Sequence, residues 1–538
     1  MTATAVEIVP VLLEESLPVE VSTKLIERGH ARRMGHLENY FALLQRQELY
    51  TNFQIYGEFN EPVSDSQLRE SLREILFKHP ILAHTIIPKD QPDFRKWYQS
   101  EKYLNTPYPL HDFIRILPEL KLSDILINKQ QEEYSDILPG ILNEFESEKK
   151  ITSSLLSRAS CLRVPIYDPK RPNWRLLRLS PRQFIYVSNH CCSDAISGVN
   201  LFQDIAEHLS SSSTSSSFPR EDDKNDNNTI FNYNSDWKFF NKLYDPITDK
   251  IEYRPKVKAL PKFACSIFVK SYLSYFNWNG LPTMRVDQPL PLLHKQFQFQ
   301  LLEFTNEELN TIRDKIKTMG CTFTPFLQAC WFIAMYKCGK VFNLKSWKEW
   351  AIDIAVPSSS RRFLIEEDDN SLKEMYKYGS NVGGFHYSYL ISSFNIDRSE
   401  NDKFFELVQY YQDGYSKSYE NGDHLIGLGI MMMDGIVQRK NIDKMIKDDY
   451  LNQTRAGVLF SNAGFFPQDE SKKYHVTDLV FNQAQGSMKF SFGLNIASTN
   501  VNGLKISVNV AEGTFDETAD FAHLCNEFKA NIVSFGGL

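Results

Sequence analysis

The stretch FIYVSNHCCSDAISG, residues 184–198, decides the fold. Its first four residues are apolar and β-prone, which predicts a buried strand. Apolar residues recur at helical spacing from Ile196 to Leu209, and Asp194 stands where a helix N-cap is expected. The sequence therefore predicts that His190 lies in a short link between a strand and a helix, where a side chain can project into a cleft.

His190 and Asp194 are the candidate catalytic residues. A neutral histidine is the natural general base near pH 7. The charge of Asp194 suits a helix N-terminus, and the same carboxylate could fix the loop that aims His190. The alternative is a chance His-x-x-x-Asp spacing in a chain with 12 histidines. The small residues after His190, including Ser193 and Gly198, favour the catalytic interpretation.

Other kinds of reactive site are weaker in this sequence. Cys191 and Cys192 adjoin His190, but neighbours on an extended strand point to opposite faces, which disfavours a thiol nucleophile. The chain holds no G-x-S-x-G elbow, no Walker loop and no G-x-G-x-x-G. Its eight cysteines form no CxxC pair and no Cys/His cluster with zinc spacing, so we expect no metal.

Predicted strands and helices alternate irregularly around this stretch. This mixture, with no internal repeat, predicts an α/β or α+β fold in two lobes, each with a mixed sheet and flanking helices. Helices are expected over 22–49 (one or two), 64–78, 112–149, 306–320, 324–339 and 516–534, and strands over 50–59, 176–189 (two), 297–304, 350–357, 457–466, 489–499 and 504–513.

One low-complexity tract divides the chain. SSSSTSSS at 210–217 and REDDKNDNN at 220–228 hold no apolar side chain to bury, which predicts a flexible linker over 210–229. The predicted N-terminal lobe is then 1–209, carrying His190. The predicted C-terminal lobe is 230–538.

Composition limits the class of protein. The 538 residues are 42% hydrophobic, enough for a large core, and the net charge of −7 gives no nucleic-acid footprint. The longest apolar runs are roughly a dozen residues, whereas a membrane-spanning helix needs about 20. The first residues, MTATAVEIVPVLLEES, have no basic n-region and make a poor signal peptide.

The His190 stretch resembles the HxxxD motif of the chloramphenicol acetyltransferase-like superfamily, which includes the BAHD acyltransferases. In order along the chain, further stretches resemble the yeast alcohol O-acetyltransferase family. They are GHARRMG (29–35), NWRL (173–176), TPFLQACWF (324–332), MYKYGSNVG (375–383), LFSNAGFF (459–466) and DLVFNQAQGS (478–487). BAHD enzymes carry a DFGWG pentapeptide late in the chain, and only Asp478 clearly matches it here.

The resemblance implies a two-lobed fold with the active-site channel between the lobes. It implies acetyl transfer from acetyl-CoA, a co-substrate, to a small or medium-chain alcohol, with no permanently bound cofactor. His190 would act as general base, with direct attack and no acyl-enzyme. Alternatives are a sterol or sphingoid amine as acceptor, a thioesterase reaction, or a non-catalytic lipid-droplet-binding protein on the same fold.

Several further residues are candidates for the site. Ser461 and Asn462 lie in an apolar strand and are candidate oxyanion donors, or else a polar kink before Gly464. Asn381 is a channel candidate, or a simple turn residue. By resemblance Asp194 is structural and pairs with an arginine. The candidate structural partners are Arg361, Arg362 and Asp478, and the two arginines could equally be surface residues.

The two ends of the chain suggest a membrane surface. Segments 22–49 and 516–535 are amphipathic, and the first holds Lys24, Arg28, Arg32 and Arg33, a cluster that suits anionic lipid. The resemblance implies a peripheral position on the cytoplasmic side of lipid droplets or endoplasmic reticulum; otherwise the protein is cytoplasmic. The alternative is that both apolar faces pack on the protein itself. We expect a monomer.

Overall fold

The structure is a computed structural model of the chain, and it describes most of residues 24–538. The described residues are 24–47, 49–50, 52–88, 112–211, 228–253, 261, 284–285, 297–339, 351–364, 370–390, 394–423, 425, 454–455, 457–484, 490–511, 514–515 and 518–538.

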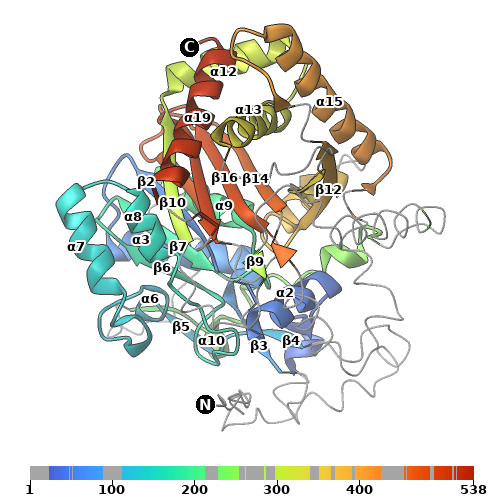
Figure 1. The fold of residues 1–538 in the computed structure, drawn as a ribbon. Helices are drawn as coiled ribbons and strands as arrows, with labels where there is room; N and C mark the ends of the chain where they lie inside the picture. Colours follow the sequence, from blue (N-terminus) through green and yellow to red (C-terminus); the bar gives the residue numbers. More distant parts are fainter. Residues whose placement is uncertain are drawn as a thin grey trace, which may run out of the picture.

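Helices and strands alternate along the chain (Figure 1). The helices are α2 (His36–Arg46), α3 (Asp65–Lys78), α6 (Leu122–Ile125), α7 (Leu138–Glu148), α8 (Ser153–Ala159), α9 (Ala195–Ser210), α10 (Tyr233–Asp236), α12 (Asn306–Thr318), α13 (Phe323–Cys338), α14 (Asn370–Met375), α15 (Asn401–Glu420) and α19 (Thr518–Gly536), with a 3-10 helix η6 (Ser360–Leu364). The strands are β1 (Ala31–Arg33), β2 (Phe53–Phe59), β3 (His84–Ile87), β4 (Phe113–Ile116), β5 (Glu119–Lys121), β6 (Trp174–Arg178), β7 (Gln183–Ser188), β8 (Thr229–Asn232), β9 (Met284–Arg285), β10 (Phe297–Phe304), β11 (Ala351–Ser359), β12 (Val382–Leu390), β13 (Thr454–Arg455), β14 (Gly457–Phe466), β15 (Val476–Gln483), β16 (Phe490–Thr499) and β17 (Gly503–Ala511).

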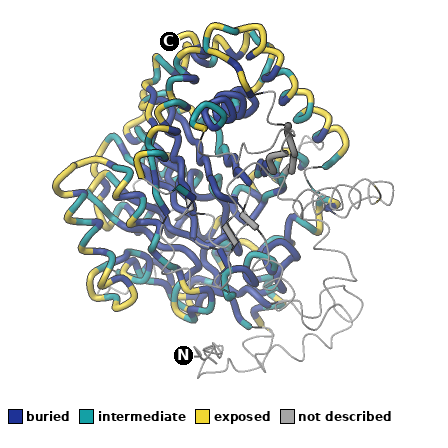
Figure 2. Tube along the Cα trace, in the orientation of Figure 1, coloured by how far each residue is buried: buried dark blue, intermediate teal, exposed yellow. Residues whose placement is uncertain are grey.

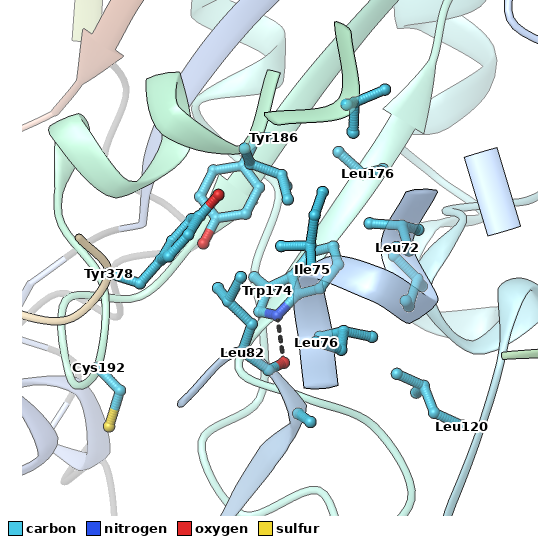
Figure 3. Packing of buried hydrophobic residues seen from close by; sticks show 14 of the residues in the cluster. Leu72, Ile75, Leu76, Leu82, Leu120, Trp174, Leu176, Tyr186, Cys192 and Tyr378 are labelled. Atoms are coloured by element: carbon cyan, nitrogen blue, oxygen red, sulfur yellow. Dashed lines mark hydrogen bonds between the residues drawn. The ribbon is translucent and has the colours of Figure 1, made fainter. Parts of the chain in front are cut away.

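A four-stranded antiparallel sheet, called here the first sheet, has the order β15-β2-β7-β6. Its strands alternate between two buried clusters, so one face packs on α3 and α9 and the other on α7 and α8. Figure 3 shows part of the α3 side, where Trp174 Nε1 donates to the Leu82 carbonyl at 2.8 Å. A Cβ at Gly198 would lie 2.7 Å from Ile55 Cγ1, so this glycine lets α9 approach the sheet closely.

A six-stranded sheet, the second sheet, has the order β10-β17-β16-β14-β11-β12. Helix α13 packs on one of its faces and is surrounded by α15 and α19 (Figure 1). The sequence 324–339 is apolar on all sides, which predicts a buried helix, and α13 is indeed buried throughout most of its length (Figure 2). This confirms the expected mixed α/β fold.

Strand β15 connects the two halves of the chain. It pairs antiparallel with β2, from Val476 opposite Phe59 to Gln483 opposite Phe53. Strand β8 likewise pairs with β5. The first sheet and its surroundings therefore take residues from both sides of the Ser-rich tract. The division at 210–229 stays a prediction, and residues 212–227 of the tract lie outside the described ranges.

The expected helix over 112–149 is wrong in its first half. Residues 113–121 form β4 and β5 instead, and α7 begins only at Leu138. The apolar spacing of this segment fits a helix, but β4 gains hydrogen-bonded partners on both sides, from β1 and β3. Tertiary pairing decided this segment against its local pattern.

The terminal segments bury their apolar faces in the fold. Among the described residues of 22–49, α2 and a turn at residues 24–27 are helical, and Leu37 and Leu43 of α2 are buried. Helix α19 packs its apolar residues, including Leu524 and Phe528, against α13. Within the basic cluster, Arg32 forms an ion pair with Glu38, and both of its terminal nitrogens lie 2.8 Å from the carboxylate oxygens. Arg28 lies over the Trp237 ring, 3.7 Å from its centroid, and Arg33 is buried, whereas Lys24 is exposed. Among the helices of the described ranges, none has the length and apolarity needed to cross a bilayer.

Candidate active site

His190 lies in the six-residue link between β7 and α9, as the sequence predicts. Strand β7 is held on both sides, by β2 and β6, so the position where the link begins is fixed. Asn189 shapes the first turn, because its side-chain oxygen accepts from the backbone N–H of Cys191 at 3.1 Å. The link is thus built from local hydrogen bonds between two rigid elements.

Three aromatic rings surround the His190 imidazole. The ring centroids of Phe53, Tyr50 and Phe41 lie 4.6, 4.8 and 5.2 Å from its own. The residue is 8% exposed, and its Nδ1 is buried with no hydrogen-bond partner among the described residues. Burial lowers the pKa of His190 to about 3, and the weaker influence of Asp194 only partly opposes it. The imidazole is therefore neutral at pH 7.

Asp194 caps α9 and binds an arginine from the second half of the chain. Its Oδ1 accepts from the backbone N–H of Ser197 at 2.9 Å. Arg361 in η6 donates from Nη1 to Oδ2 at 2.7 Å and from Nη2 to Oδ1 at 3.0 Å. These contacts outweigh the cost of burial and hold the pKa of Asp194 below its usual value. Of the two candidate arginines, the structure brings Arg361 to Asp194.

Asn381 belongs to the same network and offers no free amide to a channel. Its backbone N–H donates to Asp194 Oδ2 at 3.1 Å. Its side-chain nitrogen donates to the carbonyls of Tyr376 and Tyr378, at 2.9 and 3.2 Å. The side chain therefore closes its own turn, because carbonyls in the turn take its donor. In the structure Asn381 thus lies in a turn, one of the two roles that the sequence left open.

Arg362 and Asp478 lie elsewhere. The Arg362 guanidinium sits over the Tyr419 ring, 4.5 Å from its centroid. Asp478 is on β15, with Oδ2 3.7 Å from Lys505 Nζ, and its burial raises its pKa to about 6. Neither side chain shares a described contact with His190 or Asp194.

Ser461 and Asn462 point to opposite faces of the second sheet. Asn462 Nδ2 donates to Thr324 Oγ1 at the start of α13, at 3.2 Å, and its Oδ1 accepts from Gly464 N at 3.0 Å. The register shifts between Asn462 and Gly464, so this is the polar kink that the sequence allowed. Ser461 is the parallel partner of Asn495, whose side chain donates to the Gln483 carbonyl of β15 at 3.3 Å. Only Ser461 thus lies on the face that meets the first sheet.

Comparison with known proteins identifies the family. The sequence model of the family described as alcohol acetyltransferase matches residues 33–532. Alcohol O-acetyltransferase 2 of Saccharomyces cerevisiae is 42% identical over 537 residues, covering 97% of this chain and 99% of the relative. The chain belongs to the alcohol acetyltransferase family. Alcohol O-acetyltransferase 1 of the same yeast is 36% identical, covering 96% and 97% of the two chains.

Solved structures agree with this membership at the level of the fold. A trichothecene 15-O-acetyltransferase from Fusarium sporotrichioides has a TM-score of 0.59 at 13% identity, over 94% of this chain and 95% of that one. The condensation domain of the monacolin K polyketide synthase has a TM-score of 0.51 at 10% identity, over 94% and 97%. These fold neighbours agree with the expected two-lobed fold, and the family membership confirms the assignment as an acyltransferase enzyme.

The thiols beside His190 make poor nucleophiles in this alcohol acetyltransferase. Cys191 and Cys192 are both buried, and Cys192 belongs to the apolar cluster drawn in Figure 3. Burial raises the pKa of both thiols well above the usual value. Both therefore stay protonated near pH 7, in line with the expectation from the sequence.

The residues that touch His190 in this alcohol acetyltransferase could not be predicted from the sequence. Phe41, Tyr50 and Phe53 lie in ordinary apolar patterns, and nothing in their spacing marks them. One feature of the sequence points to Gln483. Its Oε1 accepts from the Tyr50 hydroxyl at 2.7 Å. The run FNQAQG (481–486) puts three amides at the end of a buried strand, where an apolar residue is the norm.

A hollow of about 390 Å³ (open solvent included) is lined by Arg32, Glu38, Tyr376 and Asn381 among others. His190 is not among its lining residues, and Arg32 and Glu38 form an ion pair with each other. In the described ranges no group of three or more acidic, histidine or cysteine side chains is arranged to hold a metal ion.

Proposed function

We propose that this protein is an acetyl-CoA-dependent alcohol O-acetyltransferase in which His190 is the general base. The observation that carries the proposal is a neutral imidazole in an aromatic enclosure, on a link whose aspartate is fully engaged by Arg361 and by the cap of α9. The yeast relatives supply the reaction class. The proposed acceptor is a small or medium-chain alcohol.

The reaction proceeds by direct attack. His190 takes the hydroxyl proton of the alcohol as its oxygen attacks the acetyl carbonyl carbon, giving a tetrahedral oxyanion. The carbon–sulfur bond then breaks, the carbonyl reforms, and the imidazolium returns its proton to the coenzyme A thiolate. Nδ1 is buried, which leaves Nε2 for the substrate. General base action of this kind contributes about 10²–10⁴-fold, and positioning both substrates supplies more.

Burial lowers the pKa of His190, so the imidazole is unprotonated at neutral pH and can accept a proton, but the same shift makes it a weak base. The growing negative charge on the oxyanion favours the imidazolium beside it in a low-dielectric site. Proton transfer is thereby coupled to the formation of the tetrahedral species.

Ser461 is the proposed oxyanion donor. Of the three sequence candidates, Asn381 donates both amide N–H groups to carbonyls, and the Asn462 amide donates to Thr324 on the α13 side of the second sheet. The hydroxyl of Ser461 lies on the sheet face that meets β15, the strand that also holds Tyr50 against His190. This proximity along the sheet supports the assignment.

The test is release of free thiol from acetyl-CoA with and without isoamyl alcohol, with ester detected by gas chromatography. We expect alcohol-dependent thiol release and isoamyl acetate from the wild type, and neither from His190→Ala or the bulkier His190→Gln. Thermal melting of each variant controls for folding. A folded His190→Gln protein with wild-type turnover would refute the proposal. Thiol release without ester would indicate a thioesterase instead.

We further propose peripheral attachment on the cytoplasmic side of lipid droplets or endoplasmic reticulum, by a monomer. Since α2 and α19 bury their apolar faces, the proposed attachment uses another surface. Imaging of a variant without residues 1–23 tests this, since it spares α2. Unchanged membrane localisation would exclude those residues as the anchor, and sedimentation measures the oligomeric state.

A further inference from the structure

Among the described residues, none forms the hydrogen bond to Nδ1 that usually orients a catalytic histidine. In most such sites one ring nitrogen donates to a carboxylate or carbonyl, which fixes the ring and its tautomer. Here Nδ1 has no partner among the described residues, and both oxygens of Asp194 are engaged by Arg361, Ser197 and Asn381. Within the described residues, the contacts that can orient the imidazole are those with the rings packed around it.

Of those three rings, only Tyr50 carries a polar group that can anchor it. Phe41 and Phe53 hold His190 by van der Waals contact alone. The Tyr50 ring stands edge-on to the imidazole, at an interplanar angle of 78°, and is 5% exposed. Its hydroxyl donates to Gln483 Oε1 at 2.7 Å. Tyr50 is thus fixed at one end by a hydrogen bond while its ring contacts the base at the other.

Gln483 is itself held by the second sheet. It is the last residue of β15 and is 3% exposed. Its backbone carbonyl accepts from the side chains of Asn509 on β17, at 2.8 Å, and Asn495 on β16, at 3.3 Å. The chain of contacts from His190 through Tyr50 and Gln483 thus ends on two strands of the other sheet.

We propose that Tyr50 is a positioning residue for His190 and that it acts through its hydrogen bond to Gln483. The proposal rests on the proposed function of His190. Loss of the hydroxyl leaves the buried Gln483 Oε1 without its donor and lets the ring tilt, which displaces the imidazole. Since a shift of about 1 Å at a reacting group can cost about 10²-fold in rate, the effect falls on kcat rather than on substrate binding.

The experiment compares Tyr50→Phe, Gln483→Met and the double variant with the wild type. Each single variant removes one end of the hydrogen bond and keeps the side-chain volume. We expect kcat to fall about 10- to 100-fold in each, with both KM values within about twofold. The double variant should be no slower than the slower single variant, because both changes remove the same bond.

Tyr56→Phe is the matched control. Tyr56 lies on β2 and belongs to the cluster on the α7 and α8 side of the first sheet, whereas Phe53 lies on the α3 and α9 side. The Tyr56 hydroxyl donates to Glu58 at 3.0 Å. We expect wild-type kcat from this variant. The pH profile of kcat in Tyr50→Phe should keep its shape, because a positioning hydroxyl exchanges no proton with substrate.

The outcomes separate this inference from the proposed function. Inactive His190→Gln together with wild-type kcat in Tyr50→Phe overturns the role of Tyr50 alone. A loss in Tyr50→Phe without one in Gln483→Met overturns the route through Gln483. A lower melting temperature with unchanged kcat shows a merely structural tyrosine, and a shifted pH profile shows a proton-transfer role; both overturn the inference. Wild-type turnover in His190→Gln overturns both the proposed function and this inference.

Discussion

Arg361 binds Asp194 with both terminal nitrogens, at 2.7 and 3.0 Å, although the two residues are 167 positions apart. With Ser197 and the Asn381 backbone, it fills the acceptor capacity of the carboxylate. Asp194 therefore has no lone pair left for His190. In this site the aspartate of the motif joins the link after β7 to the second half of the chain, and aromatic rings hold the base.

Asp194→Asn should destabilise the fold strongly. It leaves the Arg361 guanidinium, largely buried, without its anion, and breaking such a pair costs about 3–5 kcal/mol. Urea unfolding measures the loss, and Arg361→Lys should show a smaller one because lysine cannot form the bidentate contact. Arg362→Ala, the neighbouring exposed arginine, is the control, expected within about 0.5 kcal/mol of wild type. Equal effects at positions 361 and 362 would contradict this account.

The contribution of Asp194 to stability should depend on acid pH. Its folded-state pKa is lowered, chiefly because Arg361 opposes the cost of burial, so the unfolded chain binds the proton first as pH falls. The stabilisation is full above the unfolded pKa of about 3.9 and is lost as pH falls through the folded value. The gap in melting temperature between wild type and Asp194→Asn should therefore narrow below about pH 4. A gap that widens in acid would be the contrary result.

His190 should make the protein less stable as pH falls from about 6.5 toward 3. Its folded pKa is lowered to about 3, whereas the unfolded histidine titrates near 6.5, so only the unfolded chain binds this proton in between. The slope due to this residue is at most about 1.4 kcal/mol per pH unit. Unfolding of His190→Gln across pH 4–6.5 should show a correspondingly flatter dependence. Parallel curves for the two proteins would show that His190 is not buried in its neutral form.

Ser461→Ala should lower kcat, whereas Asn462→Ala should lower stability. Loss of an oxyanion donor costs about 10²–10³-fold in kcat, so Ser461→Ala should lower turnover with little change in stability. Asn462→Ala removes the hydrogen bonds to Thr324 and Gly464 and should cost about 1 kcal/mol of stability with kcat near wild type. Steady-state kinetics and thermal melting of both variants distinguish them. Reversed effects would move the oxyanion site to Asn462.

Local sequence patterns correctly predicted the helices and strands whose own apolar residues recur at a helical or strand spacing. Strand β7, helix α9 with its Asp194 cap, and the all-apolar helix α13 all lie where the sequence places them. The helix wrongly predicted over the first half of 112–149 was also based on the local spacing of apolar residues. Residues 113–121 became strands because β1, β3 and β8 supply their partners, and a period of apolar residues does not reveal such partners.

By itself, the sequence determined that His190 stands between a strand and a helix, that the fold is mixed α/β, and which family the chain resembles. These follow from short-range spacing and from an ordered set of motifs. Only the tertiary structure paired Arg361 rather than Arg362 with Asp194 and turned the Asn462 amide toward α13. It also brought Gln483 to Tyr50, 433 positions away, and the Tyr50 ring to the base. Such contacts depend on how sheets and turns from distant parts of the chain pack, and no local pattern encodes that packing.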